Sequence, residues 1–205
     1  MENVESKAEF VHSYLLSSST FYKEHQKDAL LELLGAQAFY PELTLGFMVS
    51  RMIWETFKEK NPDISLDFSL ATLNPLNKKN LANPDEKKII TIFSDTPSLP
   101  KQKGILKKDG LTHFYLATPV RVWNEKCLQC HGDPLDAPRF QVEMYGAEHG
   151  YNWELEQVVG SRIVYVNIEE ESQKILNDTI AAFVISLLCF LITLGLLIYY
   201  LKDEE

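Results

Sequence analysis

The sequence Cys127-Leu128-Gln129-Cys130-His131 decides what the rest of the chain has to fold around. It matches the Cys-x-x-Cys-His pattern, in which two thiols bond covalently to a haem and the histidine that follows ligates its iron. Residues three apart lie on the same side of a helical turn, so both sulfurs can reach one porphyrin. We therefore expect a single covalent haem c on Cys127 and Cys130, with His131 as the iron ligand.

Two other chemistries use the same residue types. A tetrahedral zinc site needs four ligands, but the third cysteine, Cys189, lies alone in an apolar run. A thiol–disulfide centre would need an accessible thiolate with a lowered pKa. The redox dithiol, a metal site and a chance match stay open beside the haem interpretation.

A low-spin haem needs a second ligand on its other face. The options are His12, His25, His113 and His149 among the histidines, and Met48, Met52 and Met144 among the thioethers. Met48 and Met52 lie four residues apart in a helix expected over residues 44–60, and we expect its apolar residues, Phe47, Met48, Met52, Ile53 and Phe57, to point inward. Met48 is our first choice and Met52 the second, although this spacing is also typical of ordinary core packing.

Aromatic and basic residues near the motif suggest how the haem is held. The aromatic residues expected to line its pocket are Phe114, Tyr115, Trp123, Phe140, Tyr145, Tyr151 and Trp153. Arg121 and Arg139 flank the motif, and we expect them to pair with the haem propionates. The alternative is that both are ordinary surface arginines.

An apolar run near the carboxyl end predicts a membrane anchor. Residues 180–201 (IAAFVISLLCFLITLGLLIYYL) carry no charge, and 22 helical residues cross a hydrocarbon core of about 30 Å. Residues 1–9 are polar and acidic and do not form a secretory signal. Because c-type haem is normally attached outside the cytoplasm, we expect a leading signal or membrane helix before this sequence, and a haem domain on the periplasmic or lumenal side.

Charge and motif content narrow the function. The net charge of −9 argues against nucleic-acid binding, which depends on cationic contacts. The sequence has no Gly-x-Ser-x-Gly, His-Glu-x-x-His or phosphate-loop motif, so we do not expect an enzyme.

Hydrophobic periodicity predicts an α+β fold with an antiparallel sheet. We expect N-terminal helices over residues 1–40, a haem domain over 41–168, a juxtamembrane helix over 169–179 and the transmembrane helix over 180–201. Within the haem domain, strands are expected at 66–73, 111–122 and 158–168, a short helix at 84–93, a solvated loop at 96–110 and an irregular stretch at 132–154. Val4, Ala8, Val11 and Leu15 form an apolar seam over two heptads, and we expect a homodimer through the N-terminal helices.

An ordered set of short motifs surrounds the haem pattern. They are Leu73-Asn74-Pro75-Leu76-Asn77, Thr118-Pro119-Val120, Gly132-Asp133-Pro134, Ala137-Pro138, Tyr145-Gly146, Gly150-Tyr151-Asn152-Trp153 and Val159-Gly160-Ser161. Over residues 43–168 this set resembles the haem c-binding, PAS-like sensory domains that serve as extracytoplasmic input modules of bacterial chemoreceptors, histidine kinases and cyclases. It also resembles a free-standing cyanobacterial haem c protein of the same family.

The resemblance implies a PAS-like sheet, His131 as the proximal ligand, and a distal ligand that varies between members. Some members use a sulfur ligand from the helix before the first strand, where this chain has Met48 and Met52. Sensor members carry an output domain after the second membrane helix, but here only a few residues follow that helix. We therefore expect either a redox or gas sensor that acts through a signalling partner, or an electron-transfer haem subunit of a respiratory or photosynthetic membrane complex.

Overall fold

The computed structural model describes residues 2–34 and 40–203. Its elements in chain order are α1 (Glu2–His25), α2 (Lys27–Leu34), α3 (Pro41–Thr44), α4 (Gly46–Lys60), β1 (Leu66–Thr72), the 3₁₀ helix η1 (Lys78–Asn80), α5 (Pro84–Asp95), β2 (Gln102–Lys108), β3 (Leu111–Arg121), α6 (Glu125–His131), α7 (Arg139–Tyr145), β4 (Val158–Asn167) and α8 (Ile168–Asp203). The predicted α+β fold, with a PAS-like antiparallel sheet, N-terminal helices and one long apolar helix at the carboxyl end, is confirmed.

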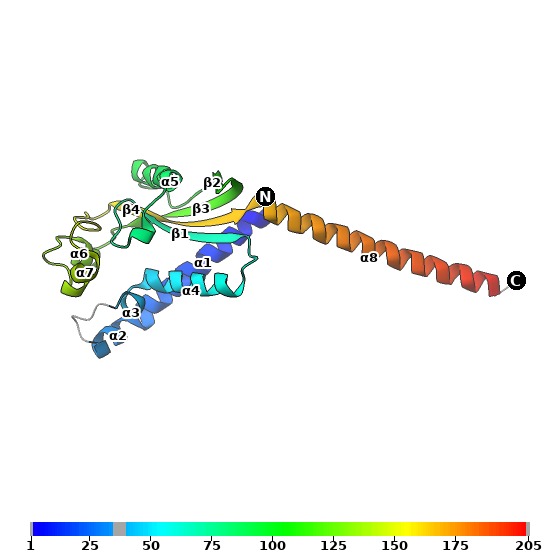
Figure 1. Ribbon diagram of the computed structural model, residues 1–205, viewed down its shortest axis with the longest axis horizontal. Helices are drawn as coiled ribbons and strands as arrows, with labels where there is room; N and C mark the ends of the chain where they lie inside the picture. The colour runs from blue at the N-terminus through cyan, green and yellow to red at the C-terminus, as the bar shows by residue number, and fades with distance from the viewer. Residues whose placement is uncertain (1, 35–39, 204–205) are drawn as a thin grey trace.

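The sheet has four strands in the order β1-β4-β3-β2, and all neighbours are antiparallel. Alternate residues face opposite sides, so each strand supplies two cores. Leu116, Val164 and Val166 pack with Val4 and Ala8 of α1 on one face. Figure 1 shows α1 and α4 on this side of the sheet and α5 on the other.

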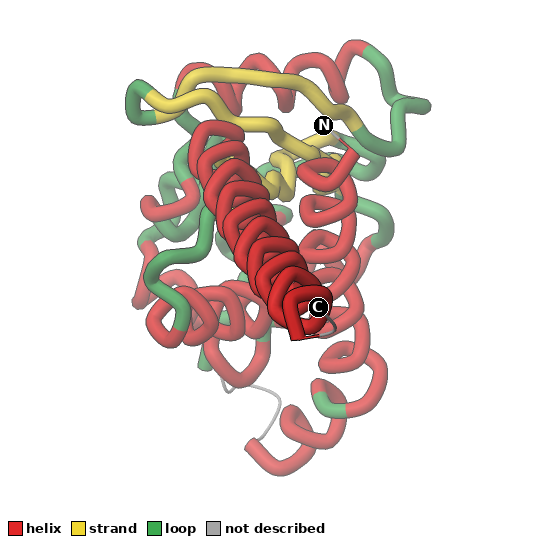
Figure 2. Tube along the Cα trace, turned by 90° about the vertical axis from the view of Figure 1, so that its right-hand side faces the viewer, coloured by secondary structure: helices red, strands yellow, loops and turns green. Residues whose placement is uncertain are grey.

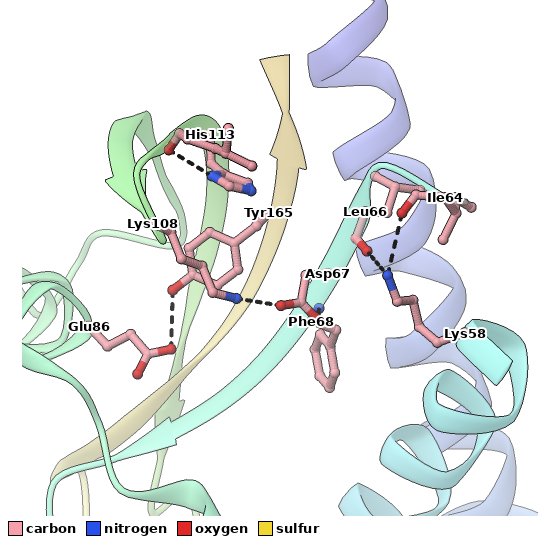
Figure 3. A network of polar contacts seen from close by, with 10 residues as sticks. Lys58, Ile64, Leu66, Asp67, Phe68, Glu86, Lys108, His113 and Tyr165 are labelled. Carbon is pink, nitrogen blue, oxygen red and sulfur yellow. Dashed lines mark hydrogen bonds and ion pairs between the residues drawn. The ribbon is translucent and has the colours of Figure 1, made fainter. Parts of the chain in front are cut away.

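The second face is covered by α5, where Ile90 and Phe93 are fully buried. Asn83 and Glu86 form a capping box at the start of α5, and Glu86 also accepts a hydrogen bond of 3.1 Å from the Tyr165 hydroxyl on β4. Lys108 lies over the Tyr165 ring and pairs with Asp67 (Figure 3). Burial and the Glu86 carboxylate raise the pKa of Tyr165, so its hydroxyl stays a neutral donor. These contacts join α5, β1, β2 and β4 into one unit.

The expectation of a solvated loop over residues 96–110 is wrong, because this stretch contains β2. Its residues alternate between half-buried and exposed positions. The hairpin turn to β3 is made by Asp109 and Gly110, both with positive φ. An Asp-Gly pair of this kind is a hairpin signal because the favoured two-residue turn requires positive φ at both positions. A short helix, α7, likewise lies within the predicted irregular stretch 132–154.

The predicted apolar seam of α1 packs inside this chain. Val4, Ala8 and Leu15 are buried against the sheet and α4, and Val11 is partly buried there. The domain boundary at residue 40 and the homodimer through the N-terminal helices stay predictions. The seam residues that such a dimer would need are packed in the core of this chain.

β4 continues into α8 without an intervening residue. The Asn167 side chain accepts hydrogen bonds from the backbone amides of Glu169 and Glu170, at 3.0 and 3.2 Å, and so begins the helix. Buried Glu171 pairs with Lys7 of α1, which ties the first turn of α8 to the domain. Beyond this turn the helix extends away from the sheet (Figures 1 and 2), and it is long and apolar enough to cross a membrane.

Candidate functional site

The Cys-x-x-Cys-His motif forms the short helix α6. The Asn124 side chain caps it by accepting a hydrogen bond of 3.0 Å from the Lys126 amide. Cys127 and Cys130 are both half-buried and lie one helical turn apart. The two thiols are therefore presented from one short rigid element, as attachment to a single porphyrin requires.

His131 ends this helix, and its ring is held on one edge and one face. Its Nδ1 lies 2.7 Å from the Gly150 carbonyl oxygen, and its ring stacks on Trp153 with centroids 3.9 Å apart and planes inclined by 8°. A carbonyl oxygen can only accept, so Nδ1 carries the proton and Nε2 keeps a free lone pair. Burial lowers the pKa of His131, which favours the neutral ring. This is the arrangement in which a histidine ligates a metal through Nε2 while a backbone carbonyl fixes its tautomer.

Backbone contacts hold the loop that supplies Gly150 and Trp153. The Trp153 amide donates to the His131 carbonyl at 3.0 Å, and the Asn152 amide donates to the Gly132 carbonyl at 2.8 Å. From α7, buried Gln141 donates to the Cys130 carbonyl at 2.6 Å, which satisfies an acceptor at the end of α6. The orientation of His131 thus depends on residues up to 22 positions later in the chain.

Two lysines from the other end of the chain have an electrostatic link to the cysteines of this motif. The Lys23 side chain packs over Gly46 at the start of α4, and the field of Cys127 acts on the Lys23 amine. The positive charge of Lys27 on α2 lowers the pKa of the Cys130 thiol, but burial has the larger effect and raises it. Of these elements, the carboxyl end of α1 contacts the start of α4 through Lys23 and Gly46.

The structure bears on the alternative chemistries of the motif. Burial raises the pKa of the Cys130 thiol, whereas a thiol–disulfide centre works through a lowered one. In the described ranges 2–34 and 40–203, no three side chains among His, Cys, Asp and Glu gather in a group that could hold a metal ion. A haem needs only His131 from this set, because the porphyrin supplies four nitrogens to the iron. The residues present fit a haem better than they fit zinc or a redox dithiol.

The expectation that Met48 and Met52 point inward is wrong. The buried residues of α4 are Gly46, Ser50 and Trp54. At 100° per residue, Met48 lies about 200° from Gly46 and from Ser50, so it is on the opposite side of the helix. It is half-buried, and Met52 is 42% exposed. The ligand role of Met48 stays a prediction, and the orientation of α4 does not favour it.

A spectrum of the Met48→Ala variant tests this ligand directly. If Met48 ligates the iron, the haem-loaded variant gains a high-spin or water-ligated spectrum. Met52→Ala is the matched control because it removes a thioether from the same face of the same helix. An unchanged Met48→Ala spectrum removes Met48 and leaves Met52 or a histidine as the ligand.

The two arginines expected near the propionates have other partners. Arg121 is buried and donates to the Pro97 carbonyl at 2.6 Å, with its guanidinium 5.9 Å from the Trp123 ring. Arg139 is exposed and pairs with Glu143 on α7 at 2.7 Å. Their role at a haem stays a prediction.

The histidine options are spread over the molecule. His12 is buried on α1, with Nε2 at 2.8 Å from the Thr118 hydroxyl. His113 lies 3.1 Å from the Leu111 carbonyl (Figure 3), and exposed His149 lies 2.9 Å from the Asn74 side-chain oxygen. Exposed His25 contacts the Phe21 ring. His12 is the one of these four histidines that is buried.

The Tll0287-like family matches residues 1–167, which is most of the chain and includes the N-terminal helices and the whole sheet. The chain belongs to the Tll0287-like family. It is also similar to a solved structure described as the crystal structure of the cyanobacterial heme-protein Tll0287. The sequence identity is 17%, the TM-score is 0.47, and the match covers 75% of this chain and 92% of that chain. No curated protein matches the chain.

Sequence reasoning included Trp153 among the residues near the haem but missed Gly150 and Gln141, which also position His131. Gly150, whose carbonyl holds the ring, has φ of +79°, and Gln141 is almost completely buried. A glycine pair flanking residues 147–149 was the available signal, because glycine is common where the chain needs positive φ.

Proposed function

We propose that the chain is a membrane-anchored cytochrome with one covalent haem c, and that it serves as a redox- or gas-sensing input module. The observation that carries the haem assignment is His131, whose Nδ1 is fixed on the Gly150 carbonyl so that Nε2 is free beside two cysteines. When bound, the haem supplies a one-electron redox centre with an exchangeable iron coordination position. The name of the solved relative, a heme-protein, agrees with this proposal.

The path from the haem motif to the anchor supports sensing. β4 begins at Val158, and the Gln157 and Glu156 backbone pairs with Val122 just before α6. At its other end β4 runs directly into α8, whose first turn is tied to α1 by Glu171 and Lys7. A displacement at the haem would therefore reach α8 through one hydrogen-bonded strand. In this function the haem domain lies outside the cytoplasm and has no catalytic activity of its own. It acts through a signalling partner and forms a homodimer through α1.

An electron-transfer subunit is the second candidate, and the surface near the motif favours it. Trp123, Leu135, Phe140 and Met144 are large apolar residues on or beside α6 and α7, and Leu135 is 91% exposed. Exposed apolar side chains near a haem suit transient docking of a redox partner.

Two spectra test the proposal and separate its two forms. A pyridine haemochrome of the purified chain, produced with a cytochrome c maturation system, is expected to show one haem c per chain, and its absence removes the proposal. The reduced protein is then exposed to carbon monoxide and nitric oxide. A ligand-induced shift supports gas sensing, whereas a spectrum that neither gas changes rules out gas sensing and favours the electron carrier.

A further inference from the structure

The Trp153 side chain lies between the proposed iron ligand and the protein surface. Its ring stacks on the His131 ring with centroids 3.9 Å apart and planes inclined by 8°. Trp153 itself is half-buried, whereas residue 152 and residues 154–157 on either side of it are exposed. One indole therefore reaches from the imidazole of His131 to a loop that faces solvent.

The backbone holds this loop in place on both sides of Trp153. The Asn152 amide donates to the Gly132 carbonyl at 2.8 Å, and the Glu156 amide donates to the Val122 carbonyl, also at 2.8 Å. Asn152 and Glu156 have φ of +58° and +66°, a conformation that residues other than glycine rarely adopt. Such backbone persists where its surroundings fix it, and it is common at functional sites.

Other contacts already orient the His131 ring. Its Nδ1 lies 2.7 Å from the Gly150 carbonyl oxygen, and the helix that it ends is held by Gln141. An aliphatic side chain could fill the space beside the ring equally well. A nearly coplanar indole adds π-electrons in van der Waals contact with those of the imidazole. With iron on Nε2, the metal gains a π-path that leads through two rings to the surface.

The surface beside Trp153 carries negative charge around an apolar residue. Glu154 and Glu156 are exposed, and neither carboxylate has an ion-pair partner among the residues that the structure describes. Leu155 between them is 48% exposed. Opposite charges steer transient encounters, so this surface suits a partner with a basic rim.

We propose that Trp153 is the path by which electrons enter and leave the iron, and that a redox partner with a positively charged surface docks over residues 153–156. This rests on the haem assignment of the proposed function, and it serves a redox sensor as well as an electron carrier. In oxidation, one electron leaves ferrous iron, which becomes ferric, and passes across His131 and Trp153 to the oxidised partner, which is reduced. No bond forms or breaks, and the Nδ1 proton stays on its hydrogen bond to Gly150.

The first test oxidises the reduced, haem-loaded full chain in an uncharged detergent with tris(phenanthroline)cobalt(III), a cationic reagent. Trp153→Leu removes the stack, Trp153→Phe keeps a flat ring with less overlap, and Trp123→Leu is the matched control because it removes an indole that is 64% exposed beside α6. Stopped-flow absorption gives the oxidation rate. We expect a loss of rate in Trp153→Leu, a smaller loss in Trp153→Phe and none in Trp123→Leu. The midpoint potential, absorption spectrum and melting temperature are measured for each variant, and the potential and spectrum should stay at wild-type values.

The second test changes the charge of the docking surface. The Glu154→Gln, Glu156→Gln double variant should lose about tenfold in rate with the cationic oxidant at low ionic strength, and gain rate with ferricyanide, which is an anion. The control is Glu55→Gln, Glu59→Gln, which removes two exposed acids of α4 and the same net charge. It should change neither rate to a comparable extent.

Three results would overturn the proposal. A Trp153→Leu rate equal to that of Trp123→Leu would assign the exchange to an exposed porphyrin edge. A loss of rate that comes only with a shifted potential and an altered spectrum would show that Trp153 merely positions His131. Equal responses of the two acidic double variants would place docking elsewhere. If Trp153→Leu does not fold, a slower Trp153→Phe at unchanged potential still decides, and a negative haemochrome on the wild type would instead contradict the haem assignment.

Discussion

The Cys127→Ala, Cys130→Ala double variant is expected to carry no covalently attached haem. Thioether bonds need both sulfurs of α6, and no other cysteine of the chain lies near that helix in sequence. The measurement is haem staining of the denatured polypeptide together with the pyridine haemochrome. Each single variant should keep the haem by one bond, with a shifted haemochrome band and a reduced yield.

Cys189→Ala is the matched control for this loss. Cys189 is exposed on α8, within the candidate membrane span, so its removal should leave the haem content unchanged. Haem staining of the denatured double variant at the wild-type level would contradict covalent attachment at α6.

Structural features that are set by residues adjacent in the sequence could be predicted from the sequence alone. The motif needs only five consecutive residues, and it forms a capped helical turn. β3 and β4 contain runs of mainly apolar residues, because each faces a core on both sides of the sheet, and such runs can be recognised as buried strands. The apolar span of α8 depends on composition alone.

The face of α4 that packs on α1 could not be predicted in this way. Gly46 packs there against Lys23 and Ser19, and the Ser50 hydroxyl donates to the Leu15 carbonyl at 2.8 Å. Small and polar residues let two helices approach closely, but a pattern that counts apolar residues selects Met48 and Met52 instead. The buried face became clear only when α1 was in place, and the Ser50–Leu15 hydrogen bond joins residues 35 positions apart.

Edge strand β2 was missed because its sequence is polar. β2 is rich in lysine because one side of an edge strand faces water, so it resembles a solvated loop. The partners that Arg121 and Arg139 have within the chain could not be predicted from their sequence positions either, and their role at a haem stays a prediction.

Gly150→Ala is expected to destabilise the domain and to disturb iron ligation together. Gly150 has φ of +79°, and an added Cβ would lie 2.6 Å from the Leu76 Cγ and 2.8 Å from the Leu76 amide nitrogen. The positive φ costs an alanine about 1–2 kcal/mol, and the crowding adds about 1–3 kcal/mol. Relief of the contact moves the carbonyl that holds His131 Nδ1 at 2.7 Å. The haem-loaded variant should therefore melt at a lower temperature and show a partly high-spin spectrum.

Gly146→Ala separates backbone strain from the loss of histidine orientation. Gly146 has φ of +78° and ψ of −177°, and an added Cβ meets nothing within 4 Å. This control should lose about 1–3 kcal/mol of stability through backbone strain and keep the wild-type spectrum, because His131 does not contact it. Thermal melts and absorption spectra of the two haem-loaded variants make the comparison. A Gly150→Ala spectrum identical to that of Gly146→Ala would show that the Gly150 carbonyl does not set the orientation of the proximal histidine.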